Sequence, residues 1–410
     1  MTRPPNILLV MADQLTAGAL PAYGNTVAKT PHIDALGARR TVFANNYCNF
    51  PICAPSRASM LTGRYATEVG AFDNGADFPS STPTLMHHLR LRGYRTILAG
   101  KMHFVGPDQL HGFDERLTTD IYPSDFSWTP NWSLPGPPES AARMSLRGVV
   151  ESGLCVRSMQ LDYDGEVAFH AERRLYDLAR DPDRPPFFMT VSFTHPHNPF
   201  VTTREYWDRY ERAEIDMLAL GPIPFQQQDG RSQRHHLLTR VDEYDVTPER
   251  LYVAGHAYYA MTSYIDDKLG ALVAALESSG LAEDTVVIFT ADHGEMLGER
   301  GMWFKMCMFE GAVRVPLLMA GGAVPAGQRV ARSTSLLDLA PTILGLAASI
   351  TPATNFTGHD LAPKHATEVD EMIAAMRPHW DLPALNRAVR DSPRRRHLLR
   401  AALAVGEPPL

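Results

Sequence analysis

Residues 53–64 read CAPSRASMLTGR, and the interpretation of the whole chain depends on this segment. Pro55 lacks a backbone N–H donor but suits the first turn of a helix, so a helix is predicted to begin here. Cys53 would then lie at the positive end of a helix dipole, where an anion is stabilised and a thiol becomes reactive. Arg57, about one turn further on, would point back to the same place. For a lone cysteine, a buried residue before an ordinary helix would be the favoured alternative.

The pattern Cys-x-Pro-Ser-Arg followed by Leu-Thr-Gly-Arg resembles the signature of the type I sulfatases, and most of the chain shares this resemblance. In that family a maturation enzyme oxidises the cysteine to formylglycine, whose aldehyde hydrates to a geminal diol. The resemblance implies that one hydroxyl, helped by a metal ion and a general base, attacks the sulfur of a sulfate ester and displaces the alcohol. The second hydroxyl then lets the covalent sulfate ester collapse back to the aldehyde. A serine at position 53 could perform only the first half of this reaction.

The composition is that of an ordinary globular protein. The 410 residues are enough for one large domain and a smaller appendage, with 44% hydrophobic and 21% charged residues. The net charge of −7 argues against a dedicated nucleic-acid-binding protein. The sequence shows neither an apolar run of about 18 residues nor a signal peptide, and its 4 cysteines are not closely paired. We therefore expect reduced thiols, a cytoplasmic location and no membrane partner.

Short apolar runs predict strands that are buried on both faces of a sheet, and each run leads directly into polar residues. The runs and the residues that follow them are 6–11 with Asp13, 94–99 with Lys101 and His103, 186–193 with His195, and 285–290 with Asp292 and His293. Ligand sites in open α/β sheets lie outside the carboxyl ends of the strands. Hydrophobic pattern and position therefore predict one shared site at this edge of the sheet.

The resemblance implies an α/β fold of the alkaline-phosphatase-like sulfatase type, with a mostly parallel central sheet flanked by helices. The catalytic domain is expected over residues 1–348. An amphipathic helix with a solvated outer face is predicted over 164–180, a long helix over 248–279 and a further strand over 313–318. In the long helix, the acidic pair at positions 266 and 267 is interpreted as helix burial with surface charge rather than as a metal site.

In the sulfatases a divalent metal ion is held by carboxylates at strand ends. The resemblance therefore implies that Asp13, Gln14, Asp292 and His293 are ligands, together with the oxygen at position 53. Taken alone, Asp13 fits a helix cap or a turn residue equally well. Gln14 stands where the family commonly has a second aspartate, a departure shared with choline sulfatases and phosphonate hydrolases. Such an oxygen-rich site suits calcium or magnesium, with calcium favoured, and His293 would admit manganese.

The resemblance assigns the remaining catalytic roles to basic residues. Arg57, Lys101 and Lys305 would neutralise the charge that develops on the reacting group. His103 would orient the diol, and His195 would hold the sulfate together with Lys305 or serve the leaving oxygen. A solvated lysine and a loop histidine are the ordinary alternatives for residues of these types.

Contacts with the substrate are predicted for Asn74 and Trp128. Asn74, within the turn-like sequence DNG, matches a polar contact near the sulfate, although a turn alone would also explain it. Trp128 lies in the irregular, aromatic segment 106–163 and matches the residue that packs on choline in choline sulfatases. An aromatic face attracts a quaternary ammonium without forming an ion pair. Residues 141–145 lack the histidine of that subgroup, which leaves choline open as the substrate.

Residues 349–410 form a shortened C-terminal region in which the resemblance is incomplete. The small antiparallel sheet and helix that wall one side of the pocket in the family look absent, whereas 378–382 and 392–396 resemble the extreme tail of choline sulfatases. The basic run from Arg394 to Arg396 is interpreted as a solvated face or a contact with another subunit. By resemblance, the chain is expected to form a homo-oligomer, either a dimer or a tetramer.

Together these observations predict a sulfatase that hydrolyses a sulfate monoester, either choline sulfate or a similar small organic sulfate. A phosphonate monoester or phosphodiester hydrolase with the same site is one alternative, because both transition states present similar charged oxygens. A sulfatase-like binding protein with impaired catalysis is another, given the shortened C-terminal region. A cysteine protease is disfavoured, because every histidine partner comes with residues of a metal or sulfate site.

Overall fold

The computed structural model describes residues 4–36, 40–131, 144–216, 220–322, 324–348, 356–358, 361, 388, 391–392 and 396. The tail segment 378–382, residues 141–143 and most of the predicted C-terminal region 349–410 lie outside the described residues. The domain boundary after residue 348 and the reduced C-terminal subdomain therefore stay predictions.

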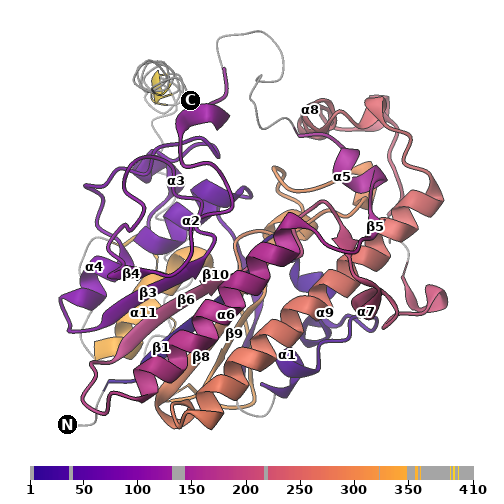
Figure 1. The fold of residues 1–410 in the computed structure, drawn as a ribbon. Helices are drawn as coiled ribbons and strands as arrows, with labels where there is room; N and C mark the ends of the chain where they lie inside the picture. Colours follow the sequence, from indigo (N-terminus) through magenta and orange to yellow (C-terminus); the bar gives the residue numbers. More distant parts are fainter. Residues whose placement is uncertain are drawn as a thin grey trace, which may run out of the picture.

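A central sheet organises the described chain, with its strands in the order β10-β2-β9-β8-β1-β6-β3-β4 (Figure 1). Neighbouring strands run parallel, except that β9 is antiparallel to both β2 and β8. The prediction of a mostly parallel sheet is confirmed. The strands of this sheet are β1 Asn6–Ala12, β2 Arg40–Tyr47, β3 Arg95–Gly100, β4 Glu115–Arg116, β6 Phe187–Ser192, β8 Thr285–Ala291, β9 Leu317–Ala320 and β10 Gln328–Ser335; β5 Gly153–Leu154 and β7 Val201–Thr202 pair separately.

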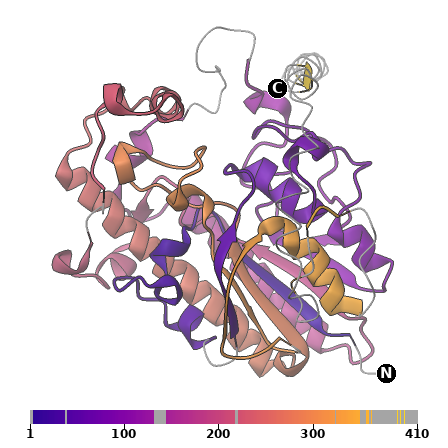
Figure 2. The same cartoon turned by 180° about the vertical axis from the view of Figure 1, so that it is seen from behind.

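Helices cover both faces of the sheet because its central strands are apolar on both sides. The long helices α6 and α9 pack against each other on the face seen in Figure 1, and α11 with α4 lies on the opposite face (Figure 2). None of the helices in the described ranges is both long and apolar enough to cross a membrane. The helices are α1 Pro31–Ala35, α2 Cys53–Thr62, α3 Ala66–Val69, α4 Leu85–Arg90, α5 Arg147–Val150, α6 Met159–Ala179, α7 Arg204–Trp207, α8 Gly230–Thr239, α9 Pro248–Ser278, α10 Glu310–Val313 and α11 Leu339–Ala348.

The carboxyl ends of four adjacent parallel strands lie side by side. In the register of the sheet, the last residue of β1 pairs with the last residue of β8, and the last residue of β3 pairs with the last residue of β6. Met11 of β1 also pairs with Ser192 of β6. The polar residues that follow these strands are therefore brought to one place, as the sequence pattern predicts.

Gly100 allows the chain to turn toward this place at the end of β3. Its φ of 102° lies in a region that side chains disfavour, and a Cβ atom there would come within 2.0 Å of the Ser192 carbonyl oxygen. Any other residue would push β3 away from β6, just before Lys101.

Two sheet features differ from the prediction. The strand predicted over 313–318 is the end of the short helix α10 followed by β9, which is antiparallel and begins only at Leu317. Strands β2 and β10 were not predicted, because their residues show no clear period-two or continuous apolar pattern. β10 carries Arg329 and Arg332 on a largely exposed surface at the edge of the sheet, so its composition is that of a surface segment.

The structure also differs in part from two predictions of solvated segments, the helix over 164–180 and the basic run 394–396. Helix α6 begins five residues before the predicted start, because the Ser158 side chain accepts a hydrogen bond from the Leu161 backbone N–H. Asp164 of this helix is fully buried rather than solvated. Arg396 is buried as well, with a bidentate ion pair to Asp73 at 2.7 and 2.8 Å. Neither side chain lies on a solvated face.

Candidate active site

Cys53 is the first residue of helix α2, where the sequence predicts a helix to begin. The backbone N–H of Ala54 donates to the Asn74 side-chain oxygen at 3.0 Å, which satisfies one of the free donors at this helix end. Helix α2 ends at Gly63, whose φ of 61° suits a glycine C-cap. Because every residue of α2 is buried, the helix start holds Cys53 rigidly inside the protein.

Four ligand-type side chains converge at the helix start. Asp13, Cys53, Asp292 and His293 are completely buried, and each offers a ligand atom within 4.8 Å of the others. The Cys53 Sγ atom lies 3.1 Å from His293 Nε2 and 3.9 Å from Asp13 Oδ1. His293 Nε2 also lies 3.6 Å from Asp13 Oδ1 and 3.7 Å from Asp292 Oδ1. One oxygen of each carboxylate therefore faces a common centre.

The second oxygen of each carboxylate contacts a buried cation. Lys101 binds Asp13 Oδ2, and the Arg57 Nε–H donates to Asp292 Oδ2 at 2.8 Å. Burial alone would raise the pKa of Asp292, but the charges of Arg57 and His293 lower it well below its usual value. Asp292 is therefore ionised. Ionised carboxylates supply the oxygen donors that suit calcium or magnesium, and the imidazole of His293 would admit manganese, so these residues fit a divalent metal ion.

The position of Cys53 favours negative charge. Burial would raise the pKa of its thiol, but the positive charges of Lys101, Lys305 and His293 lower that pKa well below its usual value. The same charges would stabilise any other anion at this place, including a sulfate group or an oxyanion on the side chain of residue 53.

Lys305 reaches the centre from the loop after β8. Its ammonium group donates to the Gln14 side-chain oxygen and lies 2.9 Å from His197 Nε2. The amide of Gln14 in turn donates to Glu295, which also accepts the backbone N–H of Phe304 at 2.6 Å. Gln14 thus links Lys305 to Glu295, and its predicted role as a metal ligand stays a prediction.

An aromatic wall borders the site on the side of β3. The Tyr122 ring lies 4.3 Å from the Lys101 ammonium, and the Trp128 ring packs 4.8 Å from Tyr122 and 5.5 Å from His103. His103 Nε2 contacts the Asn74 carbonyl oxygen at 3.1 Å. Both predicted substrate-contact residues, Asn74 and Trp128, therefore lie beside His103, within one connected set of contacts.

Gly75 explains why Asn74 and Trp128 lie so close together. A Cβ atom on Gly75 would lie 2.7 Å from the Trp128 carbonyl carbon, closer than side chains tolerate. The DNG sequence is thus a turn, as its composition predicts, and it is also the surface on which the Trp128 backbone packs.

His195 approaches from the end of β6. Its Nδ1 atom lies 2.6 Å from Asp164 Oδ2, and its backbone oxygen accepts the Asp13 N–H at 3.2 Å. The structure brings together five of the predicted catalytic residues: Cys53, Arg57, Lys101, His103 and Lys305. His195 reaches this place through its backbone oxygen, whereas the side chain of the neighbouring His197 contacts Lys305. The individual roles predicted for them stay predictions.

A second acidic group has a structural explanation. His32, Asp266 and Asp267 also place ligand-type atoms close together. However, Asp266 accepts the backbone N–H groups of His32 and Ile33 at 3.0 and 2.6 Å and so caps α1, while Asp267 pairs with Arg209 at 2.6 Å. These contacts agree with the interpretation as helix burial and surface charge.

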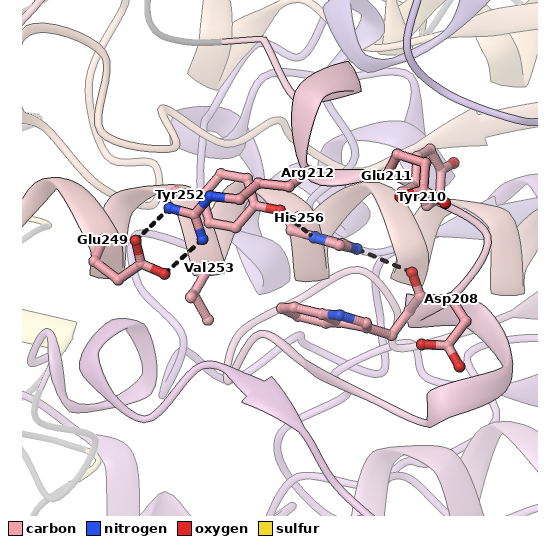
Figure 3. Close-up of a pocket in the computed structure, with 9 residues that line it drawn as sticks. Asp208, Tyr210, Glu211, Arg212, Glu249, Tyr252, Val253 and His256 are labelled. Carbon is pink, nitrogen blue, oxygen red and sulfur yellow. Dashed lines mark hydrogen bonds and ion pairs between the residues drawn. The ribbon is translucent and has the colours of Figure 1, made fainter.

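A separate cavity of about 440 Å³ lies between α7 and α9 (Figure 3). Figure 3 shows Arg212 over Tyr252 with a double contact to Glu249, and both ring nitrogens of His256 in hydrogen bonds. Trp207 stacks on His256 at 3.7 Å. Since these polar groups satisfy one another and none belongs to the predicted site, the cavity is not the candidate active site.

Sequence reasoning missed several residues that support the site. Tyr122 gives no signal, because it is one aromatic residue among many in an irregular segment. Asp164 could have been found, since it shares the buried face of α6 with Gln160, Val167 and Ala171. A carboxylate on an apolar helix face indicates a buried partner.

Comparisons with known proteins agree with this geometry. The family model described as Sulfatase matches residues 5–350. Choline-sulfatase of Rhizobium meliloti (strain 1021) is 46% identical over 349 residues, which cover 84% of this chain and 68% of that protein. Arylsulfatase K of Bos taurus is 28% identical over 403 residues, which cover 92% and 69%. Among solved structures, phosphonate monoester hydrolase of Agrobacterium radiobacter has a TM-score of 0.70 at 25% identity, covering 88% of this chain and 76% of that one.

Proposed function

The chain belongs to the sulfatase family, has its alkaline-phosphatase-like fold and is a sulfuric ester hydrolase; we propose that its substrate is the sulfate monoester of a small alcohol, with choline sulfate first among the candidates. The observation that carries this proposal is the contact of Cys53 with buried carboxylates and cations at the carboxyl ends of four strands. The 46% identity to a choline-sulfatase supports the choice of substrate.

We propose that Cys53 is converted to formylglycine and that Asp13, Asp292 and His293 hold a divalent ion, with calcium favoured by the two carboxylates. Formylglycine would supply the attacking hydroxyl, and the ion would stabilise negative charge on the reacting oxygens. The maturation enzyme, the homo-oligomer and the cytoplasmic location stay predictions from the sequence.

The basic residues would bind and orient the ester. Lys101 and Lys305 both lower the pKa of the Cys53 thiol, so their charges act at the point where an anion would bind. Arg57 holds Asp292 ionised and in place. His103 would orient the side chain of residue 53, since a hydrogen bond from it also lowers the thiol pKa.

The leaving group would lie beside the aromatic wall of Tyr122 and Trp128. The His197 ring borders this place, with its Nε2 atom 2.9 Å from Lys305 Nζ and its ring 6.1 Å from that of Tyr122, while a role of His195 at the leaving oxygen stays a prediction. Trp128 and Tyr122 would present ring faces to the quaternary ammonium of choline.

Choline recognition gives a direct test with Trp128→Ala. We expect KM for choline sulfate to rise about tenfold, because a cation–π contact contributes roughly 1–2 kcal/mol when it is desolvated. For 3,3-dimethylbutyl sulfate, a neutral substrate of the same shape, KM is expected to change about threefold or less. Steady-state kinetics of the matured, calcium-loaded protein measures both. Equal changes for the two esters would contradict choline recognition by Trp128.

The same protein decides between the sulfatase and its alternatives. Turnover of choline sulfate and 4-nitrophenyl sulfate well above that of a phosphonate monoester is the expected result. The reverse order would favour a phosphonate hydrolase, which the structural similarity to the Agrobacterium radiobacter enzyme supports. Binding of metal and sulfate without turnover, in protein that carries formylglycine, would favour the impaired binding protein.

Metal removal gives a second test. We expect EDTA to abolish turnover and added calcium to restore it. Calcium at about 100 times its Kd should stabilise the fold by about 2.7 kcal/mol, measured as a rise in Tm. Asp292→Asn should lose this rise, whereas Asp267→Asn, a change in the second acidic group, should keep it. An equal calcium-dependent rise in both variants would contradict the proposed metal centre.

A further inference from the structure

We propose that His235 of α8 is a positioning residue that holds Lys305 in the active site, an inference that rests on the proposed binding of the ester by Lys305. Helix α8 lies outside every motif that points to the site, and 70 positions separate His235 from Lys305 (Figure 1). The His235 side chain is nonetheless buried, and its Nε2 atom lies 2.7 Å from the Lys305 carbonyl oxygen. Since a carbonyl oxygen only accepts, Nε2 carries a proton and donates it to this contact.

The backbone on both sides of Lys305 has an unfavourable conformation. Phe304 has a φ of 65° and Met306 a φ of 71°, in the left-handed region that residues with a Cβ atom rarely adopt. Such a conformation persists only where surrounding contacts impose it. The position of Lys305 therefore depends on what holds this loop.

Each of the three consecutive residues is bound to a different part of the chain. The Phe304 N–H donates to Glu295 Oε1 at 2.6 Å, and the Met306 N–H donates to the Pro51 carbonyl oxygen at 3.0 Å. The contact from His235 holds the residue between them. Because Lys305 is only 2% exposed, loss of the imidazole donor would leave its carbonyl oxygen inside the protein without this partner, which favours relaxation of the loop.

The conformation of this loop also sets the place of the Lys305 ammonium group. That group donates to the Gln14 side-chain oxygen, lies 2.9 Å from His197 Nε2 and lowers the pKa of the Cys53 thiol by its charge. Movement of the Lys305 backbone would carry the charge away from residue 53. Burial lowers the pKa of His235, so its ring stays neutral and adds no second positive charge beside Lys305. Helix α8 thus acts on the site through Lys305.

The kinetic test is His235→Leu in the matured, metal-loaded protein. Leucine fills a similar space but donates no hydrogen bond. We expect kcat/KM to fall about 10–100-fold for choline sulfate and equally for 4-nitrophenyl sulfate, because both esters present the same sulfate group to Lys305. His235→Gln, whose amide nitrogen can take the place of Nε2, should stay within about threefold of the wild type. A loss in His235→Gln as large as that in His235→Leu would overturn the proposal.

His236→Leu is the matched control for the stability of α8. His236 is the next residue of the same helix and is also buried, but its Nε2 atom contacts Asp242, at 3.0 Å. This variant should change kcat/KM for either ester by about threefold or less. An effect as large as that of His235→Leu would show that the integrity of α8 matters rather than the contact with Lys305, and would overturn the proposal.

Hydrogen exchange tests the positioning without turnover. In His235→Leu, the amides of Phe304 and Met306 should exchange at least about tenfold faster than in the wild type, measured by mass spectrometry of overlapping peptides. In His235→Gln and His236→Leu their exchange should be unchanged. Unchanged exchange in His235→Leu would overturn the proposal. If the matured protein turns over no sulfate ester but exchange changes as expected, the proposed function fails and the positioning of Lys305 by His235 stands.

A spectroscopic readout on the wild-type protein does not depend on the folding of His235→Leu. The ¹⁵N spectrum of histidine-labelled protein, with His235 assigned by comparison with His235→Gln, should show a protonated Nε2. An unprotonated Nε2 could not donate to the Lys305 carbonyl oxygen and would overturn the proposal.

Discussion

Cys53→Ala is expected to lower kcat by about 10⁴-fold or more, with the fold and metal binding retained. The residue is the only side chain that places a nucleophile-forming atom among Asp13, Asp292 and His293 in the described cluster. Removal of a covalent nucleophile takes away nearly all of the catalysed reaction. Steady-state turnover of choline sulfate and a thermal melt with calcium measure the two parts of the prediction. Retention of more than about one hundredth of the activity would contradict a nucleophile at position 53.

Cys53→Ser is the matched variant for the two halves of the reaction. A serine can accept the sulfate group but lacks the second hydroxyl that releases it. We expect one equivalent of alcohol per enzyme and then no turnover, with an increase of about 80 Da in the intact mass. In the wild-type protein, the Cys53 peptide should be lighter than the thiol form by about 18 Da, or carry the mass of the hydrate. An unmodified thiol in fully active protein would exclude formylglycine.

Arg57→Met is expected to reduce the free energy of unfolding by about 3–5 kcal/mol and to abolish activity. Both Arg57 and Asp292 are completely buried, and the guanidinium also donates to Ser192 Oγ at 2.8 Å. Loss of one partner leaves the other charge buried and uncompensated, which costs more than the ion pair itself contributes. Calcium bound to Asp292 would compensate in part, so the loss should be larger in EDTA than in calcium.

Arg212→Met is the control for this effect. Arg212 pairs with Glu249 at the surface, and both side chains are more than half exposed. An exposed ion pair contributes roughly 0–1 kcal/mol, so this variant should unfold at nearly the wild-type urea concentration. Similar losses of unfolding free energy in the two variants would contradict the prediction that burial determines how much the Arg57–Asp292 ion pair matters for stability.

Local sequence patterns were sufficient to predict the residues at the centre of the candidate site. Asp13 and Asp292 could be predicted because each follows an apolar run directly, and a parallel sheet brings such positions together. Cys53 could be predicted because Pro55 marks the helix start. In each case the informative residues lie within a few positions of one another.

Residues whose roles depend on distant partners could not be predicted in this way. Tyr122 matters because it lies over Lys101, and Arg396 because it pairs with Asp73, 323 positions earlier. The helix phase of α6 places Asp164 on the buried face, but its partners Thr194 and His195 lie 30 and 31 positions away and cannot be identified from that phase. Strand β10 belongs to the sheet by pairing with β2, although its own residues are those of an exposed segment. Such features arise from tertiary contacts and leave no periodic signal.

The complete burial of Cys53 limits when its proposed oxidation to formylglycine could take place. An oxidising enzyme needs access to the thiol, and the finished fold gives it none. His293, which closes over the thiol, is 240 positions later in the chain. At roughly 5–20 residues per second, the ribosome needs about 12–48 s to add that length. The proposed conversion of Cys53 would therefore have to occur while the chain is still growing or before it folds, and a chain that folds too early would keep the thiol form.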